Sequence, residues 1–131
     1  MYKTGLNIKT FEARVVLGLK VGYLSKETIS LDDVKRAIEK SASKVDDFTF
    51  SGILTSSEIV VSGKSEYKEP AILIETSIYP RFPEEKETFK KKFTEFIGNL
   101  AVELKQERVV IRFTDESLMV ETEYCKNSDI K

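Results

Sequence analysis

Apolar residues between positions 89 and 104 constrain the fold more than any other part of the sequence. They recur at intervals of three and four residues, which places them on one face of an α-helix: Phe89, Phe93, Phe96, Ile97, Leu100, Ala101 and Leu104. Pro83 suits the first turn of a helix, and Lys105 suits the end of one because it opposes the helix dipole. The sequence therefore predicts a long helix between Phe82 and Gln106, with its phenylalanine stripe lying on an apolar sheet. We interpret Gly98, in the middle of this helix, as a point of close approach to that sheet.

Composition indicates a single soluble domain, residues 1–131, because the chain has 131 residues with 40% hydrophobic and 33% charged side chains. A net charge of -1 gives no overall field that would favour nucleic acid or an anionic membrane, so neither is expected as a partner. The first ten residues lack the apolar run of a secretory signal, and no stretch of about 20 apolar residues could span a membrane. With a single cysteine there can be no internal disulfide framework, and we expect a cytoplasmic protein.

The absence of histidine excludes a Ser-His-Asp or Cys-His site and a histidine-ligated metal. A single cysteine also excludes a thiolate zinc site. We therefore expect no cofactor and no metal, and an enzyme is the less favoured interpretation.

Periodicity predicts the other elements. Apolar residues alternate with other residues over Phe11–Tyr23, as in a strand with one buried face, and Ser30 is predicted to be the N-cap of a helix. The remaining predicted segments are an arm or edge strand at residues 1–10, a strand at Phe48–Leu54, a turn at Thr55–Ser57, an extended segment at Glu58–Val61, a mobile loop at Ser62–Glu69, strands at Ala71–Tyr79, Arg108–Phe113 and Leu118–Tyr124, and a flexible tail at residues 125–131.

This order of elements predicts an α+β fold, a two-layer ferredoxin-like arrangement (βαββαβ plus an extra C-terminal strand). Right-handed crossovers place the two helices on one face of an antiparallel sheet. The layout, with its long loop between the second and third strands, is similar to that of PII-type regulators, and this resemblance implies a trimer that senses nucleotides. The specific motifs of that family do not occur, so we assign no family on this basis.

The sheet face without helices is the first candidate site. Alternation assigns to it Glu12, Arg14, Val16, Lys20, Leu73, Glu75, Ser77, Tyr79, Val110 and Arg112. One interpretation is a subunit interface. The other is a shallow site for an anion or nucleotide, in which Arg14, Lys20 and Arg112 donate hydrogen bonds and Tyr79 stacks on a ring.

Two further segments carry candidate ligand-binding residues. Arg81 precedes the long helix, where it could grip an anion, although a rigid corner is the alternative. Lys64 and Tyr67 belong to the predicted mobile loop, which could close over a ligand or remain solvated. The triplet Gly63-Lys64-Ser65 lacks the upstream glycine of a phosphate-binding loop, so we reject that interpretation.

The sequence thus favours a small non-enzymatic binding or regulatory module that forms a homodimer or homotrimer and binds a small anionic ligand such as a nucleotide. The alternative is a protein-interaction or structural subunit, of the kind found in phages or plasmids, with no small-molecule ligand. An enzyme that uses carboxylate, tyrosine or lysine chemistry is the third hypothesis.

Overall fold

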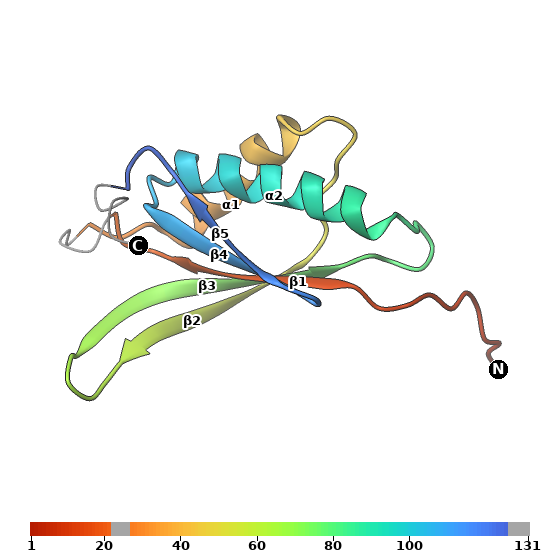
Figure 1. The fold of residues 1–131 in the computed structure, drawn as a ribbon, viewed down its shortest axis with the longest axis horizontal. Coiled ribbons are helices and arrows are strands. Elements are labelled where there is room, and N and C mark those ends of the chain that lie inside the picture. Colours follow the sequence, from red (N-terminus) through yellow and green to blue (C-terminus); the bar gives the residue numbers. More distant parts are fainter. Residues whose placement is uncertain (22–26, 126–131) are drawn as a thin grey trace.

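The structure is a computed structural model that describes residues 1–21 and 27–125. A five-stranded antiparallel sheet has the order β2-β3-β1-β4-β5, and two helices lie together on one of its faces (Figure 1). The elements are β1 (Glu12–Gly18), α1 (Leu31–Ser43), β2 (Ile53–Val61), β3 (Tyr67–Ser77), α2 (Lys86–Glu103), β4 (Arg108–Phe113) and β5 (Ser117–Glu121). The predicted α+β, ferredoxin-like fold with an extra C-terminal strand is confirmed.

The core lies between the helices and the sheet, and the phenylalanine stripe of α2 forms much of it. Phe93 and Phe96 are buried against the inward residues of β1. The rings of Phe48 and Phe50 pack on Phe96, with centroids 5.3 Å and 5.1 Å away. Because burial of one phenylalanine contributes about 1.5–3 kcal/mol, this cluster is a large part of what holds the helices on the sheet.

The two helices begin and end differently from one another. At α1 the Ser30 hydroxyl accepts a hydrogen bond from the Asp33 amide at 3.1 Å, so the predicted N-cap is confirmed. The predicted bounds of the second helix were too wide, because α2 starts only at Lys86 and Pro83 lies in the preceding corner. Its C-terminal end comes at Glu103, since Lys105 has a left-handed backbone with φ of 54°.

The interpretation of Gly98 as a point of close approach was wrong. No neighbouring atom lies within 4 Å of the position that a Cβ would take there. The helix packs through its phenylalanine stripe, and Gly98 is not in that contact.

The hairpin of β2 and β3 required the largest correction. The predicted turn at Thr55–Ser57 is part of a continuous strand, which pairs with β3 from Ile53 opposite Glu75 to Val61 opposite Tyr67. The residues between Phe48 and Gly52 form no strand, because the rings of Phe48 and Phe50 turn into the core instead. The predicted mobile loop shrinks to residues 62–66, and the hairpin projects away from the helices (Figure 1).

The first strand is shorter than predicted. β1 ends at Gly18, and Lys20 then forms an isolated bridge with Thr28. Positions 22 and 23 of the predicted strand lie outside the described residues, as do positions 126–131 of the predicted tail. The last strand also ends early, at Glu121 rather than Tyr124. Neither α1 nor α2, the helices within the described ranges, is long and apolar enough to cross a bilayer.

Candidate functional site

The open face is the side of the sheet that carries no helix. Strand register determines which side chains share it, because Arg14 lies opposite Glu75 and Val16 opposite Leu73, and both β1 residues are exposed. Continuing the same alternation brings Tyr67, Glu69, Arg108 and Ile59 onto this face. The open face therefore holds a charged and partly apolar surface, as the sequence predicted.

A small hollow lies on the open face beyond the end of β1. It has a volume of about 100 Å³ and is lined by Val16, Gly18, Lys20, Ile59, Glu69, Gln106, Glu107 and Arg108. We call it the Glu69 hollow. Strands β1, β2, β3 and the turn into β4 all contribute to it, so residues far apart in the sequence meet there.

Glu69 is the most unusual residue of the hollow, since only 7% of it is exposed although it stands on the uncovered face. One carboxylate oxygen accepts a hydrogen bond from the Lys20 backbone amide at 2.9 Å. The other accepts one from the Tyr67 hydroxyl, also at 2.9 Å. Among the described residues, no lysine or arginine forms an ion pair with this carboxylate. A buried carboxylate that has hydrogen-bond donors but no paired cation is uncommon, which makes Glu69 the first candidate for a ligand-binding residue in the hollow.

Gly18 makes room for Glu69. A Cβ at position 18 would lie 2.4 Å from Oε2 of Glu69 and 2.9 Å from its Cδ. Both distances are far below van der Waals contact, so no side chain fits at position 18 unless the carboxylate moves. The glycine thus permits the carboxylate to lie against the backbone of β1.

Positive charge in the hollow comes from Arg108 and from Lys20. The Lys20 ammonium group lies 4.7 Å from the centroid of the Tyr67 ring, in a cation–π contact. Its carbonyl accepts a hydrogen bond from the Gln106 side chain at 2.9 Å, which ties this segment to the turn after α2. Arg108 also lines the hollow and pairs with Glu121, Nε to Oε2 at 3.3 Å. The buried Glu69 carboxylate and the cations Lys20 and Arg108 therefore line the hollow, and Tyr67 lies next to it through its hydrogen bond to Glu69.

The predicted ligand-binding residues fall into separate places. Lys20 and Tyr67 meet at the Glu69 hollow. Arg14 and Arg112 are register partners in the middle of the open face, and Arg14 pairs with Glu75, Nε to Oε2 at 3.2 Å.

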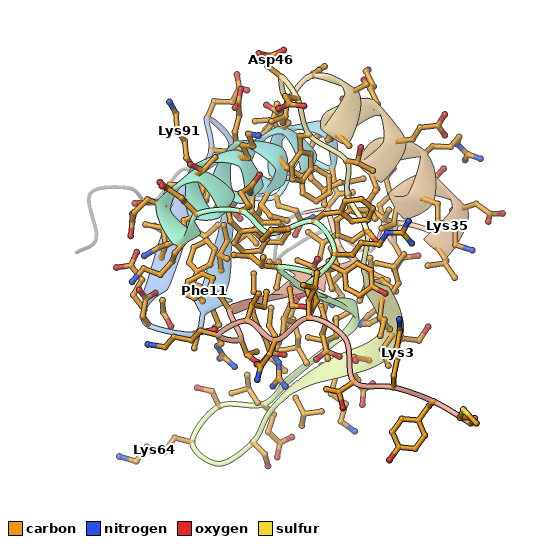
Figure 2. The ribbon with its side chains drawn as sticks, turned by 90° about the vertical axis from the view of Figure 1, so that its right-hand side faces the viewer. Lys3, Phe11, Lys35, Asp46, Lys64 and Lys91 are labelled. Atoms are coloured by element: carbon orange, nitrogen blue, oxygen red, sulfur yellow. The ribbon has the colours of Figure 1, made fainter. Side chains whose placement is uncertain are left out.

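The other predicted residues lie away from these groups. Tyr79 and Arg81 stand at the opposite end of β3, where each contacts the ring of Phe82. Lys64 lies near the tip of the hairpin, apart from the rest of the molecule (Figure 2). The candidates thus do not form one site.

Sequence reasoning missed Glu69 and Gly18 as members of the site. The sequence predicts Glu69 at the end of a mobile loop and a strand that starts only after Pro70. Tyr67 and Glu69 are in phase with Glu75 on the same strand, and this alternation was the signal that could have found them. Within residues 1–21 and 27–125, no cluster of three or more acidic or cysteine side chains could hold a metal ion.

No protein-family model matches the chain, and no curated protein sequence matches it significantly. Two solved structures have a similar fold. One is a phage SAM lyase in complex with S-methyl-5'-thioadenosine, with 22% sequence identity, a TM-score of 0.65, and coverage of 94% of this chain and 98% of that chain. The other is a phage SAM lyase in the apo state, with 24% identity, a TM-score of 0.64, and coverage of 86% and 90%. At these identities the similarity establishes a shared fold. The first of the two structures contains S-methyl-5'-thioadenosine, and the second is described as the apo state.

Proposed function

We propose that this protein binds S-adenosylmethionine (SAM) at the Glu69 hollow and cleaves it as a lyase, releasing S-methyl-5'-thioadenosine. The observation that carries the proposal is the buried Glu69 carboxylate on the open face of a fold shared with a thioadenosine-bound SAM lyase. SAM carries a sulfonium cation, and a buried carboxylate lacking an ion pair is suited to bind one.

The polar groups around Glu69 match the remaining parts of this substrate. Lys20 and Arg108 border the hollow, where they can pair with the carboxylate of the amino-acid end. Tyr67 presents an aromatic ring beside the buried carboxylate, and sulfonium cations, like ammonium cations, are attracted to ring faces.

The chemistry requires little from the protein beyond orientation. Release of the thioether breaks the bond between sulfur and Cγ of the methionine part, and the electron pair stays on sulfur. The substrate's own carboxylate attacks Cγ and closes a five-membered lactone, so no water is consumed and the charges balance. Both oxygens of Glu69 already accept hydrogen bonds. Glu69 therefore holds the cation in place and takes no proton.

A second copy of the chain completes the site in this proposal. The hollow of about 100 Å³ is smaller than the roughly 300–1,000 Å³ typical of small-molecule pockets. The open face around it carries exposed apolar side chains, among them Val16 and Met119, which association would cover. A neighbouring copy seated on the open face would supply the missing walls, in a homodimer or homotrimer.

A non-enzymatic module that binds a small anionic ligand is the second candidate function. Arg14 and Arg112 lie side by side, which favours this function. Of these two, Arg14 forms an ion pair, with Glu75, whereas no ion pair of Arg112 with a described residue occurs, so Arg112 could bind an anion. A phosphate-bearing nucleotide bound there would depend on Arg112 and not on Glu69.

Calorimetric titration of the purified protein with SAM and with S-methyl-5'-thioadenosine separates these possibilities. Glu69→Gln is the informative variant, because an amide can still accept from Lys20 and donate to the Tyr67 oxygen while it carries no charge. We expect it to weaken SAM binding at least about tenfold and to affect the neutral thioether much less. Glu39→Gln, at an exposed position of α1, is the matched control and should change neither affinity.

If Glu69→Gln lost affinity for SAM and for S-methyl-5'-thioadenosine equally, the negative charge of Glu69 would not be what binds the sulfonium cation. Loss of nucleotide binding in Arg112→Ala, with no response to SAM in any variant, would favour the second candidate. Absence of binding by every ligand would leave the protein-interaction subunit as the better hypothesis.

A further inference from the structure

The first ten residues form an extended arm that belongs to no helix or strand of the described chain. Their side chains alternate in character. In an extended chain Tyr2, Leu6 and Ile8 point to one side, whereas Lys3 and Lys9 point to the other. Tyr2 is 92% exposed and Leu6 71% exposed, and the arm contains no acidic residue. It is thus a basic strand-like segment with an apolar side that its own domain leaves uncovered.

An apolar groove lies at the other end of the sheet from the Glu69 hollow, between the segment that leads into β2 and the corner that follows β3. It has a volume of about 730 Å³. Its apolar lining includes Phe48, Ile53, Tyr79 and Phe82, and the last three are more than 60% exposed: 64%, 63% and 69%. We call it the aromatic groove.

The charge of the aromatic groove is negative. Asp47, Glu75 and Glu84 line it, and no lysine or arginine is among its described lining residues. Each of these acids already has a cation beside it, because Glu75 pairs with Arg14 and both Asp47 and Glu84 pair with Lys92. The Asp47 side chain is nevertheless 94% exposed and lies 3.6 Å from the Lys92 ammonium group, so it remains accessible at the rim. The groove is therefore complementary to the arm in both respects, since it offers aromatic surface to apolar side chains and acids to a lysine.

The arm does not occupy the groove of its own chain. Ile8 and Lys9 lie at the root of the arm, where they line a separate hollow together with Pro83 and Thr114, and none of the first ten residues lines the aromatic groove. From that root the arm runs away from the domain (Figure 1), and Lys3 lies apart from the core (Figure 2). Residues 1–7 can reach about 23 Å when extended, far enough to bridge to a neighbouring molecule.

We propose that the arm of one copy docks in the aromatic groove of a second copy, with Tyr2 and Leu6 against the aromatic side chains and Lys3 beside Asp47. Ile53 and Glu75 of the groove also belong to the open face, so a copy seated on that face would lie next to the groove. The inference concerns assembly and does not depend on the lyase activity. An extended segment exchanged in this way gains specificity from alternate side chains.

Cross-linking between two singly labelled populations tests the exchange. Both carry Cys125→Ser; one has Thr4→Cys in the arm and the other Thr49→Cys in the groove. When they are mixed with a short bismaleimide, we expect a covalent dimer. A population with Lys64→Cys at the distant hairpin tip replaces the groove partner as the control, and it should give none.

Docking of the arm in its own chain would give a different result. The double variant Thr4→Cys,Thr49→Cys would then cross-link within one chain, and the mixture would yield no dimer. That outcome, or equal dimer from the hairpin control, would overturn the proposal.

Light scattering of full-length variants gives a second readout. Tyr2→Ser with Leu6→Ser should weaken self-association at least about tenfold, since two apolar anchors are lost. Lys3→Glu should weaken it less, and adding Asp47→Lys should restore it because the pair is then reversed. Association that is unchanged in all three variants would contradict the proposal, and the SAM titration above would still report on the function independently.

Discussion

Replacing Gly18 with alanine tests how tightly the Glu69 carboxylate is held. In an ordinary strand this change stabilises the protein by roughly 0.5–1 kcal/mol, because glycine loses more backbone entropy on folding. Here the new Cβ would lie 2.4 Å from Oε2 of Glu69, so the carboxylate has to move. Movement away from β1 breaks the 2.9 Å hydrogen bond from the Lys20 amide first.

A hydrogen bond to a charged group contributes about 1.5–3 kcal/mol, and the entropic gain of alanine offsets part of its loss. We therefore expect Gly18→Ala to be destabilised by about 1–2 kcal/mol and to bind SAM more weakly. The assay is urea-induced unfolding at neutral pH, followed by circular dichroism, with calorimetric titration of SAM on the folded variant.

Gly98→Ala is the matched control. It makes the same chemical change in the interior of α2, where no neighbouring atom lies within 4 Å of the new methyl group. Alanine should stabilise that position by about 1 kcal/mol, the opposite sign. If Gly18→Ala is as stable as the wild type, or more so, the carboxylate is free to shift and the reasoning about the hollow is wrong.

Three other perturbations test the core, the helix cap and the hollow. Phe96→Ala should cost about 3–5 kcal/mol in thermal or urea unfolding, because the ring is buried among other phenylalanines; a loss below about 1 kcal/mol would contradict the described core. Ser30→Ala should lower stability by about 1 kcal/mol through the lost N-cap. The Ser30 hydroxyl, and then Arg36, hold the pKa of Asp33 below its ordinary value of 3.8. Wild-type stability should therefore fall as the pH drops through that lowered pKa, and Ser30→Ala should lose less over the same acid titration; parallel curves would refute this. Tyr67→Phe should weaken SAM binding several-fold in calorimetry by freeing one oxygen of Glu69, and unchanged affinity would count against the hollow.

Much of the fold follows from periodicity in two segments. The alternation of β1 and the phenylalanine stripe of α2 each require a buried partner, and together with right-handed crossovers they leave one arrangement. Boundaries were less predictable. Pro83 is compatible with a first helical turn, but the Phe82 amide donates to the Tyr79 carbonyl at 2.9 Å in a turn, and the helix begins later.

Pro70 explains why the candidate site was not found from the sequence. A proline inside a central strand removes a hydrogen bond, so the strand was expected to start after it. In the structure the Pro70 carbonyl accepts from the Leu19 amide at 2.9 Å. In a regular antiparallel ladder the Leu19 carbonyl would accept a hydrogen bond from the amide of residue 70, but proline has no amide hydrogen. The Leu19 carbonyl instead accepts a hydrogen bond from the Ile29 amide at 2.7 Å. The strand therefore continues through Pro70, and this long-range pairing cannot be read from local sequence.

The same pairing defines the hollow. Because β3 continues back to Tyr67, Glu69 lies beside Gly18, 51 positions earlier in the sequence. A glycine on this face of the strand indicates room for a close neighbour, but it does not indicate which residue that neighbour is. Arg14 and Arg112, by contrast, could be placed on the open face from alternation alone, and the structure makes them register partners. Sequence thus identified the face, whereas the position of the hollow on it required the strand register.

Incubation of the full-length protein with SAM, followed by identification of the products by mass spectrometry, tests whether the Glu69 hollow supports lyase activity. The account predicts S-methyl-5'-thioadenosine together with a four-carbon amino lactone that carries no oxygen from isotope-labelled water at early times. Glu69→Gln should lose most of this activity, and Glu39→Gln should keep it. Intact SAM with the wild-type protein, or equal turnover by Glu69→Gln, would contradict the account.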